Sequence, residues 1–273
     1  MRRNGDRGLA GGDREILDRG YGFHRTGDRW LPDRWLGMPG SGVTPPPAGL
    51  SDGDRVSLWS DSSGNGHDAS QSGTARPVFK TNILNGKPVV RFTATGSQFF
   101  NIPTPVPGAH PWTIFTVFKP VSTSVIHASI ASATAALAGL VAVSDGNLYI
   151  VTQGWVGSAS NAWAGGFHIF TTQALATGVP LLWVDGTSAS ASQSPGGGVV
   201  NFDAIGNYVG NFSDGDIAEI IMYSGALTLL RATDRANIEK YLGTKYGIGV
   251  AGGSAVQPDT VTGLLAWWKA DSL

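Results

Sequence analysis

Frequent turn signals limit what this chain can fold into. Glycine and proline account for 39 and 15 of its 273 residues, and they separate short runs of β-branched and aromatic residues. These signals recur about every 8–12 residues, a spacing typical of a β-sandwich or barrel. Charged residues make up only 14 % of the chain, too few for a helical bundle, and 41 % of the residues are hydrophobic, too many for a disordered chain. The sequence therefore predicts an all-β fold.

Several runs carry the pattern of individual strands. Residues 112–118 alternate threonine with bulky side chains, as expected of a strand with one buried face. Residues 140–143 and 148–151 flank an Asp-Gly turn and predict a hairpin. Alternation along the strands predicts that the side chains pointing into the sandwich include Val90, Phe92, Ile114 or Phe115, Trp183, Ile220 and Met222.

One helix is predicted, from about residue 229 to residue 246. Ile238, Tyr241 and Leu242 follow helical spacing, and Gly247 suits the left-handed conformation that ends many helices. We expect the face formed by these three side chains to pack on the sandwich.

Residues 1–49 differ from the rest and end in a proline linker. They hold 8 of the 19 basic residues and 6 of the 20 acidic ones, with Gly-Asp-Arg repeated at 5–7, 12–14 and 27–29. No helical or strand period persists, so this segment is an extended arm without a core of its own. Two interpretations remain open: a disordered tail, or an arm that assembles with other subunits through Trp30, Trp35 and Leu36.

Four stretches between residues 50 and 248 occur in a familiar order. They are WSDSSGNGHDA at 59–69, NGKPVVRF at 85–92, WTIFTVF at 112–118 and GDIAEIIMYSGAL at 215–227, which is followed by the helix. In this order they resemble the laminin-G-like, concanavalin-A-like jelly-roll domains of bacterial and phage proteins. The resemblance implies an antiparallel two-sheet jelly-roll sandwich. It implies no single function, because this fold serves lectins, adhesion modules, glycosidases and virion proteins.

The last strand departs from the family order. A strand similar to residues 263–273 comes first in the family, whereas here it follows a linker at 249–262. Strict alternation along this strand predicts Leu264, Ala266 and Trp268 on one face, and Leu265, Trp267 and Lys269 on the other. It closes the sandwich in cis, is donated to a neighbouring chain, or begins a second repeat. We favour closure in cis, with donation close behind and with Trp267 and Trp268 as assembly residues. In either case Leu273 should lie near Leu50 or Ser51 of the completed domain.

The sequence predicts no catalytic residues. A glycosidase on this fold needs two carboxylates about 5–5.5 Å apart across the scissile bond. Outside the arm, the close acid pairs Asp52/Asp54 and Asp214/Asp216 lie in glycine-containing turns, and Glu219 stands alone on its strand. No Gly-x-Ser-x-Gly motif occurs. We therefore expect that the protein is not an enzyme.

Two further motifs predict ligand sites. Asp61, Asn65 and Asp68 resemble the start of a calcium loop, but Ser72 stands where the closing acid belongs, so a hydrogen-bonded turn is the preferred interpretation. No cofactor other than this calcium is expected. Trp155, Asn161 and Trp163 lie in a Gly/Ser-rich stretch that suits sugar binding, because exposed tryptophan faces stack on sugar rings, but core or interface packing of the tryptophans is the preferred interpretation.

These observations favour a structural protein of a virion, such as a capsid decoration, head-fibre or tail protein. Its partners would be other copies of itself and other virion proteins, contacted through the arm. The alternative is a carbohydrate-binding adhesion module outside the cell or on its surface, with glycans as partners. A net charge of −1 gives no attraction for nucleic acid or anionic membranes, no apolar run of membrane-spanning length occurs, and no secretory signal is expected at the N-terminus.

Overall fold

The computed structural model describes residues 23–26, 29–32, 49–121, 127–134, 137–142, 148–152, 155–156, 166–175, 179–189, 201–224 and 230–273. The chain divides into two compact units, Met1–Ala48 and Gly49–Leu273. Within the first unit, β1 (Phe23–Thr26) and β2 (Arg29–Pro32) form an antiparallel hairpin. Among the described residues, no helix is long and apolar enough to cross a membrane.

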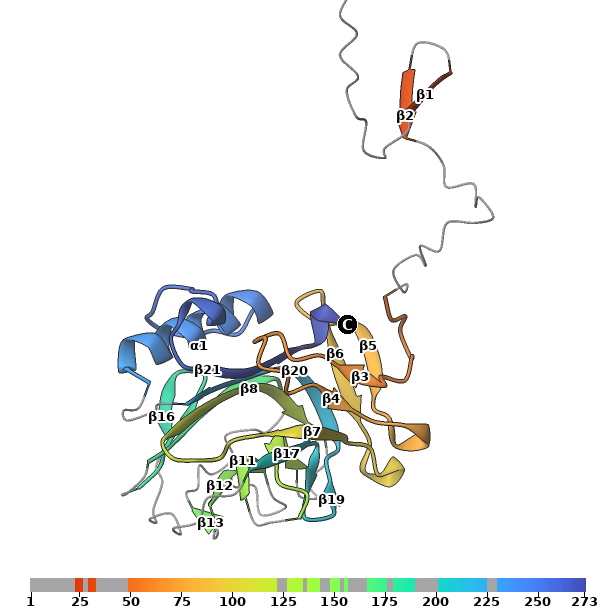
Figure 1. The fold of residues 1–273 in the computed structure, drawn as a ribbon. Helices are drawn as coiled ribbons and strands as arrows, with labels where there is room; N and C mark the ends of the chain where they lie inside the picture. Colours follow the sequence, from red (N-terminus) through yellow and green to blue (C-terminus); the bar gives the residue numbers. More distant parts are fainter. Residues whose placement is uncertain are drawn as a thin grey trace, which may run out of the picture. The chain divides into compact units, whose positions relative to one another are not determined.

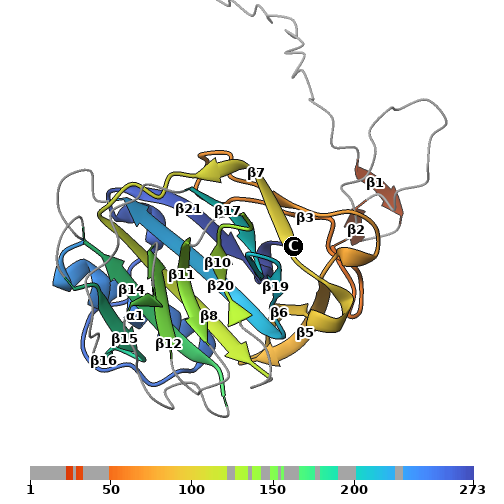
Figure 2. The same cartoon turned by 90° about the horizontal axis from the view of Figure 1, so that it is seen from below.

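The second unit is a sandwich of two antiparallel sheets that lie face to face (Figure 1 and Figure 2). One sheet runs in the order β13-β12-β11-β10-β17-β7-β4-β3, with β9 beside β11. The other runs in the order β16-β15-β14-β8-β20-β6-β5, with β21 beside β20. This architecture confirms the predicted jelly-roll-like sandwich.

The strands of the two sheets have the following bounds. The first sheet contains β3 (Leu58–Trp59), β4 (Ala69–Ser70), β7 (Phe100–Val106), β9 (His127–Ala128), β10 (Ile130–Ala131), β11 (Leu137–Ala142), β12 (Leu148–Thr152), β13 (Trp155–Val156) and β17 (Phe202–Ile205). The second contains β5 (Val78–Leu84), β6 (Lys87–Phe92), β8 (Trp112–Pro120), β14 (His168–Ala174), β15 (Leu181–Val184), β16 (Thr187–Ala189), β20 (Gly215–Ser224) and β21 (Leu264–Lys269). A small hairpin is formed by β18 (Asn207–Tyr208) and β19 (Asn211–Phe212).

The core lies between the sheets, and strand alternation decides which side chains enter it. On β8, Trp112 and Ile114 belong to this core, whereas Phe115 points to the opposite face. The prediction for Trp183 is wrong: its neighbour Leu182 enters the core, because Leu182 pairs with Thr172 on β14 and takes the inward position. Trp183 is only half-buried, on the other face.

The helix α1 (Ala232–Tyr246) covers the outer face of the second sheet (Figure 1). Ile238, Tyr241 and Leu242 are buried in a cluster that also includes Phe115, which confirms the predicted packing face. Gly247 ends the helix at φ 70° and donates its backbone N–H to the carbonyl of Gly243, as a left-handed cap requires.

The terminal strand β21 pairs with β20 of its own chain. The register joins Ile221 to Trp267 and Met222 to Ala266, after which a bulge shifts the pairing so that Tyr223 faces Leu264. The bulge explains why one prediction from strict alternation is wrong: Leu264 packs with Trp267 on the helix side instead of with Ala266 in the core.

The chain beyond β21 reaches the start of the sandwich. Leu50 and Leu273 both pack against the core between the sheets. The carbonyl oxygen of Leu273 lies 3.8 Å from the position that a Cβ on Gly49 would occupy. The end of the chain therefore lies beside the first residues of the domain, as the family order predicts.

Candidate functional site

A loop of polar residues at 61–68, the Asp61 loop, runs along the edge of β21 that does not face β20. The backbone N–H of Ser62 donates to the carbonyl of Trp267 at 2.7 Å, and the N–H of Trp267 donates to Asp61 Oδ1 at 2.9 Å. Asn65 Nδ2 donates to the carbonyl of Leu265 at 2.8 Å, where the strand bulges. The strand therefore has hydrogen-bond partners on both edges, and a free edge that would invite association is covered.

The predicted calcium residues belong to this loop. Asp61 accepts four hydrogen bonds, from the N–H and hydroxyl of Ser63 and from the N–H groups of His67 and Trp267. Asp68 Oδ1 accepts the N–H of Asp61 at 2.8 Å. Among the residues that the structure describes, no group of three or more His, Cys, Asp or Glu side chains could hold a metal ion. The loop uses these oxygens as hydrogen-bond acceptors, in the way that the turn interpretation expects.

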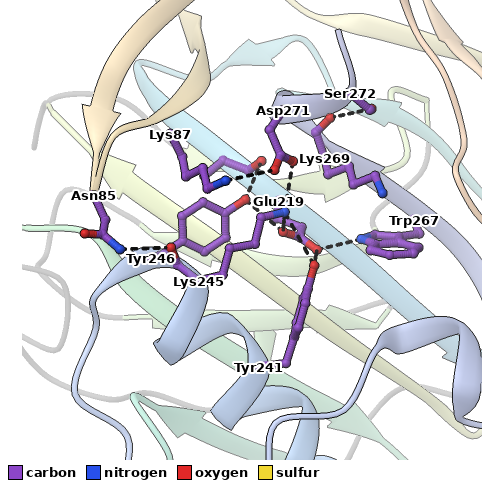
Figure 3. A network of polar contacts seen from close by, with 11 residues as sticks. Asn85, Lys87, Glu219, Tyr241, Lys245, Tyr246, Trp267, Lys269, Asp271 and Ser272 are labelled. Atoms are coloured by element: carbon purple, nitrogen blue, oxygen red, sulfur yellow. Dashed lines mark hydrogen bonds and ion pairs between the residues drawn. The ribbon is translucent and has the colours of Figure 1, made fainter.

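A second polar cluster surrounds Glu219 of β20, beneath helix α1 (Figure 3). Glu219 is fully buried, because it lies on the face of β20 that carries Ile221 and Tyr223 and that α1 covers. Its Oε1 accepts Trp267 Nε1 at 2.6 Å and the Tyr241 hydroxyl at 3.3 Å. Its Oε2 accepts the Tyr246 hydroxyl and Lys245 Nζ, both at 2.8 Å. Four donors compensate a carboxylate that would otherwise be costly to bury.

Burial controls the protonation of the two tyrosines in this cluster. Desolvation, together with the negative charge of Glu219, raises the pKa of Tyr246 well above its ordinary value. The same two causes raise the pKa of Tyr241. Both phenols therefore stay protonated at physiological pH and remain hydrogen-bond donors to Glu219.

Three of the four aspartates in the close acid pairs, Asp52, Asp54 and Asp216, also accept hydrogen bonds from neighbouring residues. Arg91 donates to both oxygens of Asp216, at 2.7 and 2.8 Å. The hydrogen bond from Lys80 is the main cause that lowers the pKa of Asp52, and Asp54 accepts the N–H of Ser51. These contacts tie strands and turns together, and they leave few of the expected acids free to act on a substrate.

Glu239 is the buried acid with the least complete set of partners. It forms an ion pair with Arg235, which lies 4.3 Å from the centre of the Trp183 ring. Its Oε1 has no hydrogen-bond partner, and burial raises the pKa of the carboxyl. Glu239 thus holds Arg235 within α1, and it is Arg235 that links the helix to the strand of Trp183.

Of the three predicted sugar-binding residues, the structure describes only Trp155. Trp155 lies in β13, the outer strand of its sheet, opposite Val151 of β12. Asn161 and Trp163 lie outside the described residues.

The predicted assembly residues fall into two groups. Trp30 pairs with Arg25 in the β1–β2 hairpin, while Trp35 and Leu36 lie outside the described residues. Trp267 and Trp268, by contrast, are 4 % and 0 % exposed inside the sandwich unit.

Those two terminal tryptophans have specific partners in their own chain. Trp267 donates its indole N–H to Glu219, and Trp268 donates its indole N–H to the carbonyl of His67 at 3.1 Å. Donating β21 to another chain would have to break both contacts and open the core.

The Glu219 cluster is the main feature that the sequence analysis missed. Glu219 was considered only as a lone acid on its strand, with no catalytic partner. A signal was available: the acid lies between Ala218 and Ile220, within a run of apolar residues long enough for a buried strand. A carboxylate in such a run requires donors from neighbouring elements.

Comparisons with known proteins bear on the fold alone. No protein-family model and no curated protein matches the sequence. The structure is similar to domain 4 of AbnA, a GH43 extracellular arabinanase from Geobacillus stearothermophilus solved in complex with arabinotriose. That match has 14 % identity and a TM-score of 0.44, and it covers 64 % of this chain and 96 % of that one.

Two other solved structures are also similar to this chain. Full-length tailspike protein 2 from Escherichia coli O157:H7 bacteriophage CAB120 matches at 12 % identity with a TM-score of 0.44, over 83 % of this chain. The match spans only 31 % of the tailspike. The native heptameric SAP-like pentraxin from Limulus polyphemus matches at 12 % identity with a TM-score of 0.34, over 63 % of this chain and 89 % of that one.

The hydrogen-bonding role of the Asp61 loop gives a direct test. Replacing Asp61 with Ala leaves the N–H of Trp267 and the two N–H groups of the loop without acceptors, so it should cost ~1–3 kcal/mol of unfolding free energy. Urea unfolding with calcium and with a chelator should give the same loss. A wild-type protein that is stabilised by calcium, while Asp61→Ala is not, would show that the loop is a metal site.

Proposed function

We propose that residues 49–273 form a non-enzymatic, carbohydrate-binding jelly-roll module. The observation that carries the proposal is the position of Trp155 on β13, the outermost of the described strands of its sheet, which pairs with β12. From β13 the chain passes Asn161 and Trp163 before it enters β14 of the other sheet. The flat face of a tryptophan at a sheet edge suits stacking on a sugar ring, and Asn161 supplies both a donor and an acceptor for hydroxyl groups.

The partners of the acidic side chains support a role without catalysis. Glu219 and Asp61 each accept four hydrogen bonds, and Asp216 is held by Arg91. A glycosidase needs one carboxyl to donate a proton and a second to attack or to activate water. Asp61 and Asp216 are held by structural donors, and the side chain of Glu219 is 0 % exposed beneath α1, so these acids are poorly placed to act on a sugar.

The burial of the terminal strand also supports carbohydrate binding over assembly in a virion. Trp267 and Trp268 are buried and hydrogen-bonded within the sandwich unit, which agrees with the favoured closure in cis and gives no support to their use as assembly residues. The N-terminal unit is then the main support for the assembly hypothesis. As a binding module, the protein would act outside the cell or on a surface, whether cellular or viral.

Sugar binding is tested by a glycan array followed by calorimetry on the best ligand. Trp155→Ala and Trp163→Ala should each weaken binding about tenfold or more, which corresponds to ~1.4 kcal/mol or more of lost stacking. Trp183→Ala is the matched control, because it removes a half-buried tryptophan from β15 of the other sheet. Equal affinity of all three variants and the wild type, or no glycan bound at all, would contradict the proposal.

Assembly in a virion is the second candidate, and one observation favours it. Met1–Ala48 is a compact unit separate from the sandwich and contains its own hairpin. A segment of this kind can contact other copies of the chain or other virion proteins while the sandwich stays intact.

Removing residues 1–48 tests the second candidate. Light scattering after size exclusion should show that residues 49–273 are a folded monomer, whereas the full chain forms larger species. If both proteins have the same oligomeric state, the N-terminal unit does not drive self-assembly.

A further inference from the structure

Three reactive side chains from distant parts of the chain meet at one point under α1 (Figure 3). Lys245 lies in the last turn of α1, and its Nζ is 2.8 Å from Glu219 Oε2. The same nitrogen is 2.9 Å from Oδ1 of Asp271, which lies just beyond β21 in the 3-10 turn Ala270–Ser272. An amine therefore touches two carboxylates, one on a central strand and one at the end of the chain.

The surroundings of this triad exclude most water. The side chain of Glu219 is 0 % exposed and that of Lys245 is 12 % exposed, whereas Asp271 is 24 % exposed. The rings of Tyr241 and Tyr246 have their centres 5.7 and 5.2 Å from Lys245 Nζ. Burial therefore holds the amine against both carboxylates and limits the access of bulk water to the reacting groups.

We propose that Lys245 and Asp271 condense into an isopeptide bond, an amide between their side chains, with Glu219 as the proton carrier. An amine that is held in contact with a carboxyl group has already lost the translational freedom that makes amide formation slow in solution. A deprotonated lysine in a desolvated site is a competent nucleophile. Asp271 has the exposure that a departing water requires.

The reaction balances with no other reagent. Glu219 takes one proton from the Lys245 ammonium and passes it to the Asp271 carboxylate, which leaves a neutral amine and a neutral acid. The amine nitrogen then attacks Cγ of Asp271. Glu219 carries a second proton from that nitrogen to the hydroxyl oxygen, the C–O bond breaks and one water leaves. Glu219 ends in its original state.

The bond would join the last turn of α1 to the residue that follows β21. The terminal strand already lies between β20 and the Asp61 loop. A covalent link at its far end would prevent β21 from leaving the sandwich, whatever the module binds. The inference is independent of the proposed function, because it concerns how the domain is closed.

Intact-mass spectrometry of the purified full chain tests the proposal. The wild type should be lighter than Lys245→Arg, after correction for the substitution, by the mass of one water. Tryptic digestion should yield a branched peptide that joins residue 245 to residue 271. A folded wild-type protein at its full sequence mass would overturn the proposal and leave an ordinary ion pair.

Three further variants locate the chemistry. Asp271→Asn should lose one ammonia in place of one water, because the leaving group changes. Glu219→Gln should restore the full mass, with unchanged circular dichroism as the check on its fold. Lys87→Arg is the control, since Lys87 Nζ lies 3.8 Å from the other oxygen of Asp271. If the mass deficit disappears in Lys87→Arg and persists in Lys245→Arg, the assignment to Lys245 is wrong.

Discussion

The buried carboxylate of Glu219 is the interaction on which the rest of the sandwich depends. Its four donors come from α1 and from β21, so one side chain on β20 fixes both the covering helix and the terminal strand. If α1 shifted, Oε2 would lose both of its donors, and if β21 shifted, Oε1 would lose its shorter hydrogen bond, from Trp267. Leaving a charged oxygen short of donors in the interior costs more than the net gain from an ordinary hydrogen bond. The carboxylate therefore specifies where these two elements dock as well as stabilising them.

The position of β21 gives the domain two different edges. Along β21 the sheet is closed by the Asp61 loop, whose side chains take the place of a further strand. In the other sheet, β13 is the outermost of the described strands and carries Trp155. The part that holds the domain together and the part proposed to bind therefore lie in different sheets.

Much of the fold follows from local patterns, while the polar clusters do not. The helix, its Gly247 cap and the alternation along β8 were predictable because each depends on neighbouring residues. Trp183 and Leu264 were misplaced because a pairing register and a bulge are set by other strands. The partners of Glu219 lie on separate elements, so no local pattern unites them. The proposed sugar site was readable from composition, but only Trp155 of its three residues lies within the described part of the chain.

The central claim is that β21 completes the sandwich of its own chain. The most direct test removes residues 263–273 and measures the unfolding free energy of the monomer in urea. Deleting a strand that buries Trp267 and Trp268 should cost at least ~3–5 kcal/mol, the range for truncating a single large aromatic side chain in a core. A truncated monomer as stable as the full chain would contradict the account. If intersubunit links were lost at the same time, the strand would belong to a neighbouring chain.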